Sequence, residues 1–196
     1  MIGLILAVAL WGVVHSVLAS FDFKENLRRT FGNGPMKFYR LLYNLFAAIS
    51  FLPVLYLMTI LPDAPFYAVQ PPWSYLMLAG MGISALLLLV ALIQTDILSF
   101  AGWRQLADEE KPGRLVTDGF YRLVRHPLYT FGLLVLWLTP TLTLNTFIVY
   151  AALTLYILSG IIFEERKLVR EFGQEYENYR RKTPMLIPGL GIGRNK

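Results

Sequence analysis

Residues 127–163 read PLYTFGLLVLWLTPTLTLNTFIVYAALTLYILSGIIF and contain no charged side chain. A stretch of this length and polarity can cross a bilayer and return, which predicts an apolar hairpin with spans at 127–144 and 146–163. Two polar blocks flank it, GFYRLVRHPLYTFG at 119–132 and EERKLVREFGQEYENYRRKTP at 164–184. A hairpin brings both blocks to the same membrane surface. Because ionisable groups at the edge of a hydrocarbon layer are costly and tend to mark sites, we place the chemistry there.

The composition is that of a membrane protein. Of the 196 residues, 56% are hydrophobic and only 16% are charged, whereas an ordinary soluble domain has about a quarter of charged residues. The chain has no cysteine, which excludes disulfides, thiolate metal sites and a cysteine nucleophile. Its net charge of +5 comes from basic residues that lie between or after apolar segments. We therefore attribute that charge to membrane topology and expect no nucleic-acid partner.

The apolar segments predict an all-α, polytopic membrane protein with five transmembrane helices, in which residues 1–196 form a single membrane-embedded domain. We expect N-terminal spans within 1–100 and a cofactor-binding C-terminal region at 101–188. The expected spans are 2–20, 41–61, 73–100, 127–144 and 146–163, and residues 21–40 read as a polar loop. The last helix is expected to continue into water as far as Arg181, as an amphipathic extension, because apolar residues recur there at helical spacing.

Basic residues alternate between the two sides of the predicted spans. There are none before the first span, five after it, none after the second, five after the third, none after the fourth and eight after the fifth. The positive-inside rule predicts this alternation for an odd number of spans. We therefore expect the N-terminus outside, and the C-terminus and the active site in the cytoplasm.

The first polar block combines an arginine, a histidine and a predicted helix start. Pro127 suits the first position of a helix, and the residue before a proline, here His126, is restricted to extended geometry. Free backbone N–H groups, the positive end of the helix dipole and Arg125 together suit a carboxylate or phosphate group. A simpler interpretation is that the arginines only follow the positive-inside rule, while Tyr121 and Tyr129 form an interfacial aromatic belt.

The second polar block opens with Glu164 and Glu165, which can accept hydrogen bonds from ribose hydroxyls or an ammonium group, or can simply be solvated at a helix exit. The two histidines, His15 and His126, lie far apart in the sequence, and no spacing such as HExxH exists. We therefore predict no metal site. His15 and Asp96 lie near the cytoplasmic ends of the first and third spans, where either can face a reaction cavity.

These motifs carry a family resemblance. The sequence LVTDGFYRLVRHPLYTFG at 115–132, followed by EERKLVREFGQEYENYRRKTPMLIP at 164–188, contains RHPxY, EExxL and FGxxYxxYxxxxP in that order. It resembles the C-terminal signature of the integral-membrane methyltransferases that include isoprenylcysteine carboxyl methyltransferase and the phospholipid N-methyltransferases. The segments WGVVHSVLAS at 11–20 and FYRLLYN at 38–44 also resemble the bacterial branch that contains methanethiol S-methyltransferases.

The resemblance implies S-adenosylmethionine as methyl donor and a bacterial inner membrane as location. Residues that match cofactor-contacting positions of the family are Gln105, Leu115, Val116, Tyr121, His126, Pro127, Leu128, Tyr129 and Glu164. The family's substrate-binding arginine is replaced by Gly160, which disfavours a prenylcysteine carboxylate as acceptor and leaves a small thiol, an amine or a lipid. For a thiol, His15 is the candidate general base.

Two other functions stay open at this point. Membrane reductases of the sterol-reductase type share a related RHPxY region but use NADPH, and they typically read HPNY where this chain has Leu128. The other class is a non-catalytic membrane module, such as a small transporter. The few polar residues within the spans, and the position of the ionisable clusters on one side only, favour an enzyme over such a module.

Overall fold

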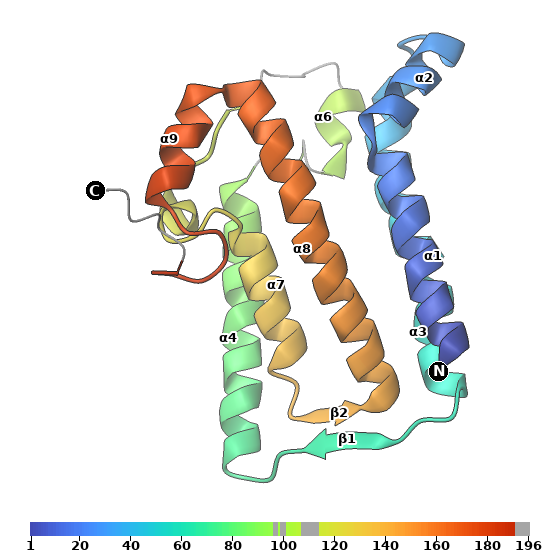
Figure 1. Ribbon diagram of the computed structural model, residues 1–196, viewed down its shortest axis with the longest axis vertical. Helices are drawn as coiled ribbons and strands as arrows, with labels where there is room; N and C mark the ends of the chain where they lie inside the picture. The colour runs from blue at the N-terminus through green and yellow to red at the C-terminus, as the bar shows by residue number, and fades with distance from the viewer. Residues whose placement is uncertain (96–97, 99–100, 107–113, 191–196) are drawn as a thin grey trace. The chain divides into compact units, whose positions relative to one another are not determined.

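The computed structural model describes residues 1–95, 98, 101–106 and 114–190, and Figure 1 shows that nearly all of its regular structure is helical. The all-α prediction is therefore confirmed at the level of architecture. The first compact unit contains α1, α2, α3, α6 and the start of α8, and the second contains α4, η1, α7, the rest of α8 and α9. The elements are α1 (Ile2–Ala19), α2 (Phe21–Phe31), α3 (Met36–Ile60), β1 (Pro65–Ala68), α4 (Trp73–Gln94), α6 (Trp103–Leu106), η1 (Gly119–Arg122), α7 (Pro127–Trp137), β2 (Thr141–Thr143), α8 (Leu144–Phe172) and α9 (Gln174–Lys182).

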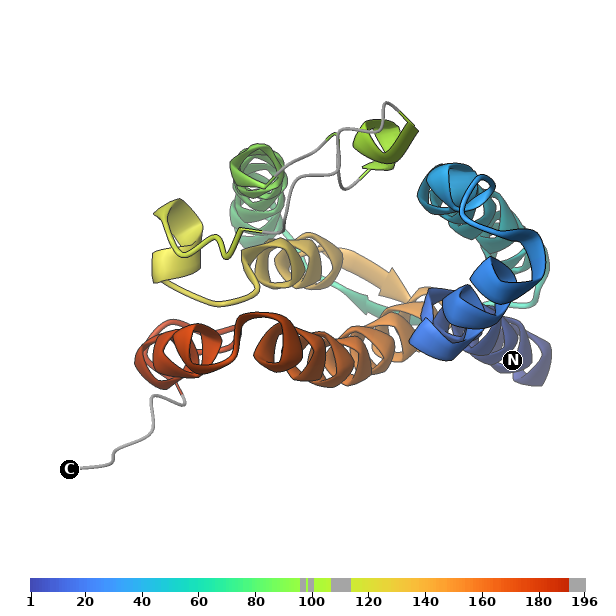
Figure 2. The same ribbon diagram turned by 90° about the horizontal axis from the view of Figure 1, so that it is seen from above.

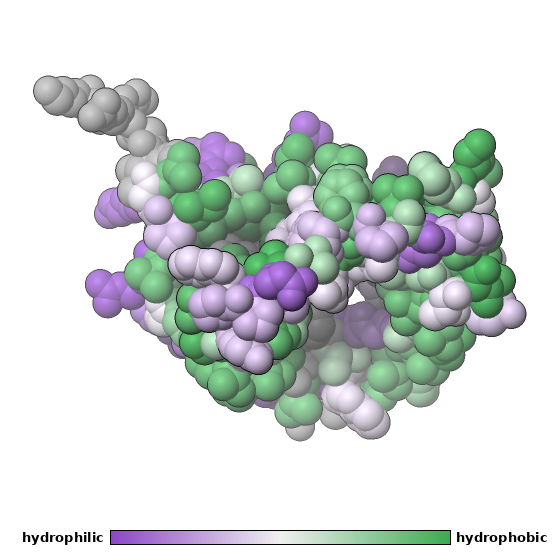
Figure 3. All heavy atoms as spheres, turned by 90° about the horizontal axis from the view of Figure 1, so that it is seen from below, coloured by the Kyte–Doolittle hydropathy of each residue, from purple (hydrophilic) through white to green (hydrophobic). Residues whose placement is uncertain are grey.

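Four of the helices, α1, α3, α4 and α8, are long and apolar enough to cross a membrane. A crossing helix needs about 20 predominantly apolar residues, and α7 is apolar but has only 11. Large apolar side chains are exposed along these helices, and Figure 3 shows them over much of the visible face. Such a surface suits lipid and not water, so the chain is an integral membrane protein.

The segment after the first span is a helix, α2, and not the loop that we expected. The side chain of Ser20 caps it by accepting a hydrogen bond from the Phe23 N–H at 3.3 Å. Asp22 lies in its first turn, and Arg29 pairs with Glu25 at 3.2 Å one turn earlier. The cap and this pairing are ordinary helix signals, and they stabilise a short polar helix between two apolar ones.

In the second unit, α7 packs along α4 (Figures 1 and 2). At one end, the Gln94 side chain accepts a hydrogen bond from the Phe120 N–H at 3.0 Å. Further along, Leu138 lies against Gly80, and at the far end the Val69 N–H donates to the Pro140 carbonyl at 2.9 Å. The chain from about residue 120 to residue 140 therefore runs beside the whole of α4.

Two differences from the predicted fourth span concern its end. The helix stops at Trp137, and residues 141–143 form β2, which pairs with β1 in a two-stranded sheet. The start of α8 is then fixed by Asn145, whose side-chain nitrogen donates to the Leu61 carbonyl at 3.3 Å and whose N–H donates to the Asp63 carboxylate at 2.9 Å. These contacts satisfy polar groups at a helix start.

The predicted continuous helix to Arg181 is also wrong, because the chain breaks at Gly173. This glycine has a φ of +55°, in the left-handed region that favours glycine, and it separates α8 from α9. The break folds α9 back so that Tyr176 is buried. The third span ends as a helix at Gln94, and most of the remainder predicted up to residue 100, including Asp96, lies outside the described residues.

Candidate active site

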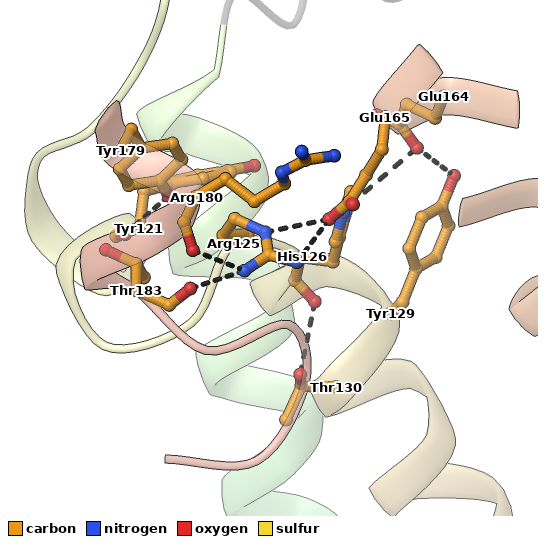
Figure 4. A network of polar contacts seen from close by, with 10 residues as sticks. All are labelled: Tyr121, Arg125, His126, Tyr129, Thr130, Glu164, Glu165, Tyr179, Arg180 and Thr183. Carbon is orange, nitrogen blue, oxygen red and sulfur yellow. Dashed lines mark hydrogen bonds and ion pairs between the residues drawn. The ribbon is translucent and has the colours of Figure 1, made fainter. Parts of the chain in front are cut away.

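The two polar blocks that flank the apolar hairpin meet in the second unit, as predicted (Figure 4). Arg125 forms an ion pair with Glu165, with its Nη2 at 2.6 Å and its Nε at 2.7 Å from the same carboxylate oxygen. The His126 Nε2 lies 3.3 Å from that oxygen. On the adjacent residue, Glu164, the carboxylate accepts a hydrogen bond from the Tyr129 hydroxyl at 2.9 Å.

The start of α7 is held by the chain that follows α9. The N–H groups of Arg125 and His126 donate to the carbonyls of Pro184 and Met185 at 2.8 and 3.2 Å. One turn later, the Thr130 hydroxyl donates to the Leu186 carbonyl at 2.8 Å. Because Pro127 has no N–H and suits the first position of a helix, α7 begins directly after this paired segment.

Arg125 is the residue that joins the three segments of the site. Its Nη1 donates to the backbone carbonyls of Arg180, at 3.1 Å, and Thr183, while its other two nitrogens contact Glu165 (Figure 4). The side chains of Arg125 and Glu165 are only 9% and 14% exposed. All three guanidinium nitrogens are thus engaged by protein acceptors, so in this geometry Arg125 orients α7, α8 and the end of α9 relative to one another.

The start of α7 still offers hydrogen-bond donors. Among the described residues, the backbone N–H groups of Leu128 and Tyr129 have no acceptor, as expected in the first turn of a helix. The side chain of Glu164 is 42% exposed, so its carboxylate can accept further hydrogen bonds. Two donors at a helix start, and a carboxylate acceptor beside them, suit a ligand that carries both a carboxylate and hydroxyl or ammonium groups.

Tyrosine side chains surround this donor and acceptor set. The Tyr179 hydroxyl donates to the Tyr121 carbonyl at 2.6 Å and so fixes α9 against η1. Burial, together with the negative charge of Glu164, raises the pKa of Tyr121 to about 12. The Tyr121 phenol is therefore neutral at physiological pH, and its ring offers an uncharged aromatic face.

Gly119 begins η1 with a φ of +60°. This backbone conformation favours glycine, and a Cβ atom there would lie 2.5 Å from the Nε2 of Gln94, so the end of that side chain would have to move.

The other predicted site residues have these positions. Leu115 and Val116 are half-buried in the irregular segment before η1, Pro127 is buried and Leu128 is half-buried. His15 and Gln105 belong to the first unit, on α1 and α6. The His15 Nε2 is hydrogen-bonded to the Tyr43 hydroxyl, and its ring stacks on Trp11 with centroids 4.9 Å apart.

Several residues that hold the site together are missing from the predicted site, among them Glu165, Thr183 and Gln94. The sequence carried a signal for the first, since Glu165 is the second carboxylate of the EExxL motif. It carried a signal for Gln94 as well, because this residue is a lone polar side chain at the end of an apolar span. Thr183 contributes only its carbonyl to Arg125, and side-chain chemistry gives no signal for that.

Comparison with known proteins agrees with the motifs. The chain matches the NnrU protein family over residues 3–192. It is 34% identical to the methanethiol S-methyltransferase of Crocosphaera subtropica, over 96% of this chain and 76% of that protein. It is 30% identical to methanethiol S-methyltransferase 1 of Bradyrhizobium diazoefficiens, over 94% of this chain and 65% of that protein. It is also 40% identical to the protein-S-isoprenylcysteine O-methyltransferase of Schizosaccharomyces pombe over 78 residues, which cover 38% of this chain and 33% of that protein. No solved structure matches significantly. Matched over nearly its whole length, the chain belongs to the NnrU protein family and is a relative of proteins named as methyltransferases.

Proposed function

We propose that the protein is a membrane methyltransferase that transfers a methyl group from S-adenosylmethionine to a small or lipophilic acceptor, with a thiol as the first candidate. The observation that carries the proposal is the meeting of the α7 start with Glu164, through the Tyr129 hydroxyl at 2.9 Å. The thiol is supported by the names of the methanethiol S-methyltransferases of Crocosphaera subtropica and Bradyrhizobium diazoefficiens. Gly160 has no side chain to bind a prenylcysteine carboxylate.

The donor and acceptor set fits S-adenosylmethionine. The open N–H groups of Leu128 and Tyr129 would hold its carboxylate, and Glu164 would accept from its ammonium group or its ribose hydroxyls. The rings of Tyr121 and Tyr129 offer faces for its adenine. Leu115, Val116 and Gln105 are further expected contacts. Arg125 acts as a positioning residue, since its three nitrogens are bound by protein acceptors.

The bound donor supplies an electrophilic methyl group on a sulfonium whose leaving group is a neutral thioether. The protein therefore needs no general acid, and alignment of donor and acceptor is its main contribution to the rate. A base is needed only for an acceptor that arrives protonated, such as a thiol. We assign this role to His15, so His15→Ala is expected to lower turnover on a thiol and leave donor binding intact. Unchanged turnover of the purified variant would remove His15 from the mechanism.

The proposed topology has five crossings. An 11-residue α7 is only about 16 Å long, against a hydrocarbon core of about 30 Å. The segment from residue 120 to residue 140 nevertheless runs from Gln94 at one end of α4 to Val69 beyond its other end, so it crosses wherever α4 crosses. From the distribution of basic residues we propose that the N-terminus lies outside and that both polar blocks lie at the cytoplasmic surface. The bacterial relatives support a bacterial inner membrane as the location.

A methyl-transfer assay tests this function. The purified protein in nanodiscs is supplied with donor labelled in its methyl group, and with thiols, amines, prenylcysteines or phospholipids as acceptors. We expect transfer to at least one thiol. At a donor concentration below saturation, Glu164→Gln should lower the rate of transfer about tenfold to a hundredfold, since hydrogen bonds to charged groups contribute about 1.5–3 kcal/mol. Glu171→Gln, an exposed glutamate further along α8, is the matched control. Equal rates for the two variants would contradict the assignment of the site.

A further inference from the structure

A hollow with a volume of about 440 Å³ lies on α8 and α9. Its apolar part is formed by Ile161, Ile162 and Val169, and its basic part by Arg166, Arg170 and Arg180. All of these residues belong to the second unit.

On α8 the hollow is lined chiefly by residues that face away from the proposed donor site. Successive helix residues turn by about 100°, so Ile162 and Arg166 lie on the opposite face from Glu164. Glu165 lies between the two faces and belongs to the inner wall of the hollow. Glu164 and Tyr129 take no part in its lining, so the hollow is distinct from the proposed donor site. It adjoins that site, because Glu165, Arg180 and Met185 belong both to its lining and to the contacts that hold α7.

The hollow is strongly positive. Among the described residues, the guanidinium groups of Arg166, Arg170 and Arg180 have no carboxylate partner, and all three residues are exposed. The one carboxylate in the lining, that of Glu165, is already bound by Arg125. Figure 4 shows the Arg180 side chain reaching from α9 toward α8. Guanidinium forks in this arrangement suit a phosphate group.

The position of the hollow on α8 indicates the source of such a phosphate. Leu155, Leu158, Ile162, Arg166 and Arg170 follow one stripe of the helix, at spacings of three and four residues. The first three are exposed and apolar, and the stripe changes to arginine directly after the apolar part of α8 ends at Phe163. Arg166 lies over the Phe163 ring, 5.7 Å from its centroid. An apolar stripe that ends in free arginines matches an amphiphile with acyl chains and an anionic head.

We propose that this hollow binds the headgroup of an anionic phospholipid of the surrounding bilayer, with its phosphate between Arg166, Arg170 and Arg180. Its acyl chains lie along Leu155, Leu158 and Ile162. The bound lipid anchors the end of α8 at the membrane surface, next to the segment that carries Glu164 and Glu165.

Native mass spectrometry of the protein in micelles of a neutral detergent measures which lipids it retains, and so tests the proposal. The three probes are short-chain phosphatidylglycerol, short-chain phosphatidylcholine and glycerol phosphate. Each arginine near a lipid surface contributes about a fivefold gain in binding, so Arg166→Gln/Arg170→Gln should weaken phosphatidylglycerol binding about thirtyfold. Arg181→Gln/Lys182→Gln is the matched control, because it removes the same charge from exposed positions of α9 outside the hollow.

Three results would overturn the proposal. Phosphatidylcholine that binds as tightly as phosphatidylglycerol would mean that the site does not select anionic lipids. Glycerol phosphate that competes equally would identify a site for a free phosphate compound, and an equal loss in the control variant would indicate only diffuse surface charge. If the glutamine variant fails to fold, the relative affinities of the wild-type protein for the three probes still test the proposal. The readout is lipid retention, so its failure leaves the methyl-transfer proposal untouched.

Discussion

The ion pair between Arg125 and Glu165 gives the sharpest test of how the site is held together. Replacing Arg125 by methionine keeps an unbranched apolar stem and removes two contacts to the carboxylate and two to the carbonyls of Arg180 and Thr183. Glu165 would then be left nearly buried, with only the His126 Nε2 at 3.3 Å. Removal of one partner of a buried pair costs about 3–5 kcal/mol, and because His126 still contacts the carboxylate we expect about 3 kcal/mol.

The second variant of the pair completes a double-mutant cycle. Glu165→Gln removes the charge but leaves Arg125 with its two backbone carbonyls, so we expect a loss of about 2 kcal/mol in the free energy of unfolding. In the double variant neither charge is left unpaired, so its loss should be smaller than the sum of the single losses by about 2 kcal/mol. Equilibrium unfolding in mixed micelles, titrated with sodium dodecyl sulfate and followed by tryptophan fluorescence, measures these values.

The chain supplies its own control pair in Arg29 and Glu25 on α2. Their side chains are 77% and 48% exposed and 3.2 Å apart, and an exposed pair at this spacing contributes about 0.3–0.5 kcal/mol. The same cycle there should give a coupling within that range. If the coupling of Arg125 with Glu165 were no larger than that of the control pair, the claim that this pair fixes α7 and α8 would be refuted.

Three further predictions concern the surroundings of the site and the start of α8. Gly119→Ala should lower the free energy of unfolding by about 2–3 kcal/mol, because it places a Cβ in the left-handed region and displaces Gln94, and an unchanged unfolding midpoint would contradict this. Tyr129→Phe should weaken donor binding about threefold to tenfold with little change in stability, since the variant loses the hydroxyl that orients the partly exposed Glu164; binding as tight as in the wild type would count against that role. Hydrogen bonds from the Thr143 hydroxyl and the backbone N–H of Asn145 hold the pKa of Asp63 below its ordinary 3.8, so its stabilising effect is complete above that pH and is lost as the pH falls through the lower folded-state pKa. Asp63→Asn should therefore reduce the fall of the unfolding midpoint as the pH is lowered from about 5 through the folded-state pKa, and an identical acid dependence in the variant would exclude this role.

Much of the membrane fold could be predicted from the sequence, because long apolar runs have few alternatives in a bilayer. The boundaries of α1 agree with the first predicted span within a residue. Short polar elements were harder to predict. The charges of residues 21–40 favour a polar loop, as positive-inside topology requires, although the capping serine at position 20 and the pair of Glu25 with Arg29 are signals for a helix.

The missed features depend on tertiary contacts or on single backbone angles. The helical spacing of apolar residues continues through Gly173, so periodicity alone cannot reveal that α8 ends there. The sheet of β1 and β2 has strands of only four and three residues, too short for an alternating pattern. In the site, the motifs predicted that the two polar blocks would meet. They did not reveal that all three guanidinium nitrogens of Arg125 contact protein acceptors, because two of these acceptors are backbone carbonyls.

The central claim is tested most directly by measuring the binding of S-adenosylhomocysteine, the product that the methyl donor leaves after transfer. Isothermal titration of the purified protein in nanodiscs should show one S-adenosylhomocysteine bound per chain and no heat of binding for NADPH. Glu164→Gln should weaken that binding by about tenfold to a hundredfold, and Glu171→Gln should leave it unchanged. Binding of NADPH in place of S-adenosylhomocysteine, or equal affinities for the two glutamine variants, would contradict a methyl-donor site formed by the start of α7 and Glu164.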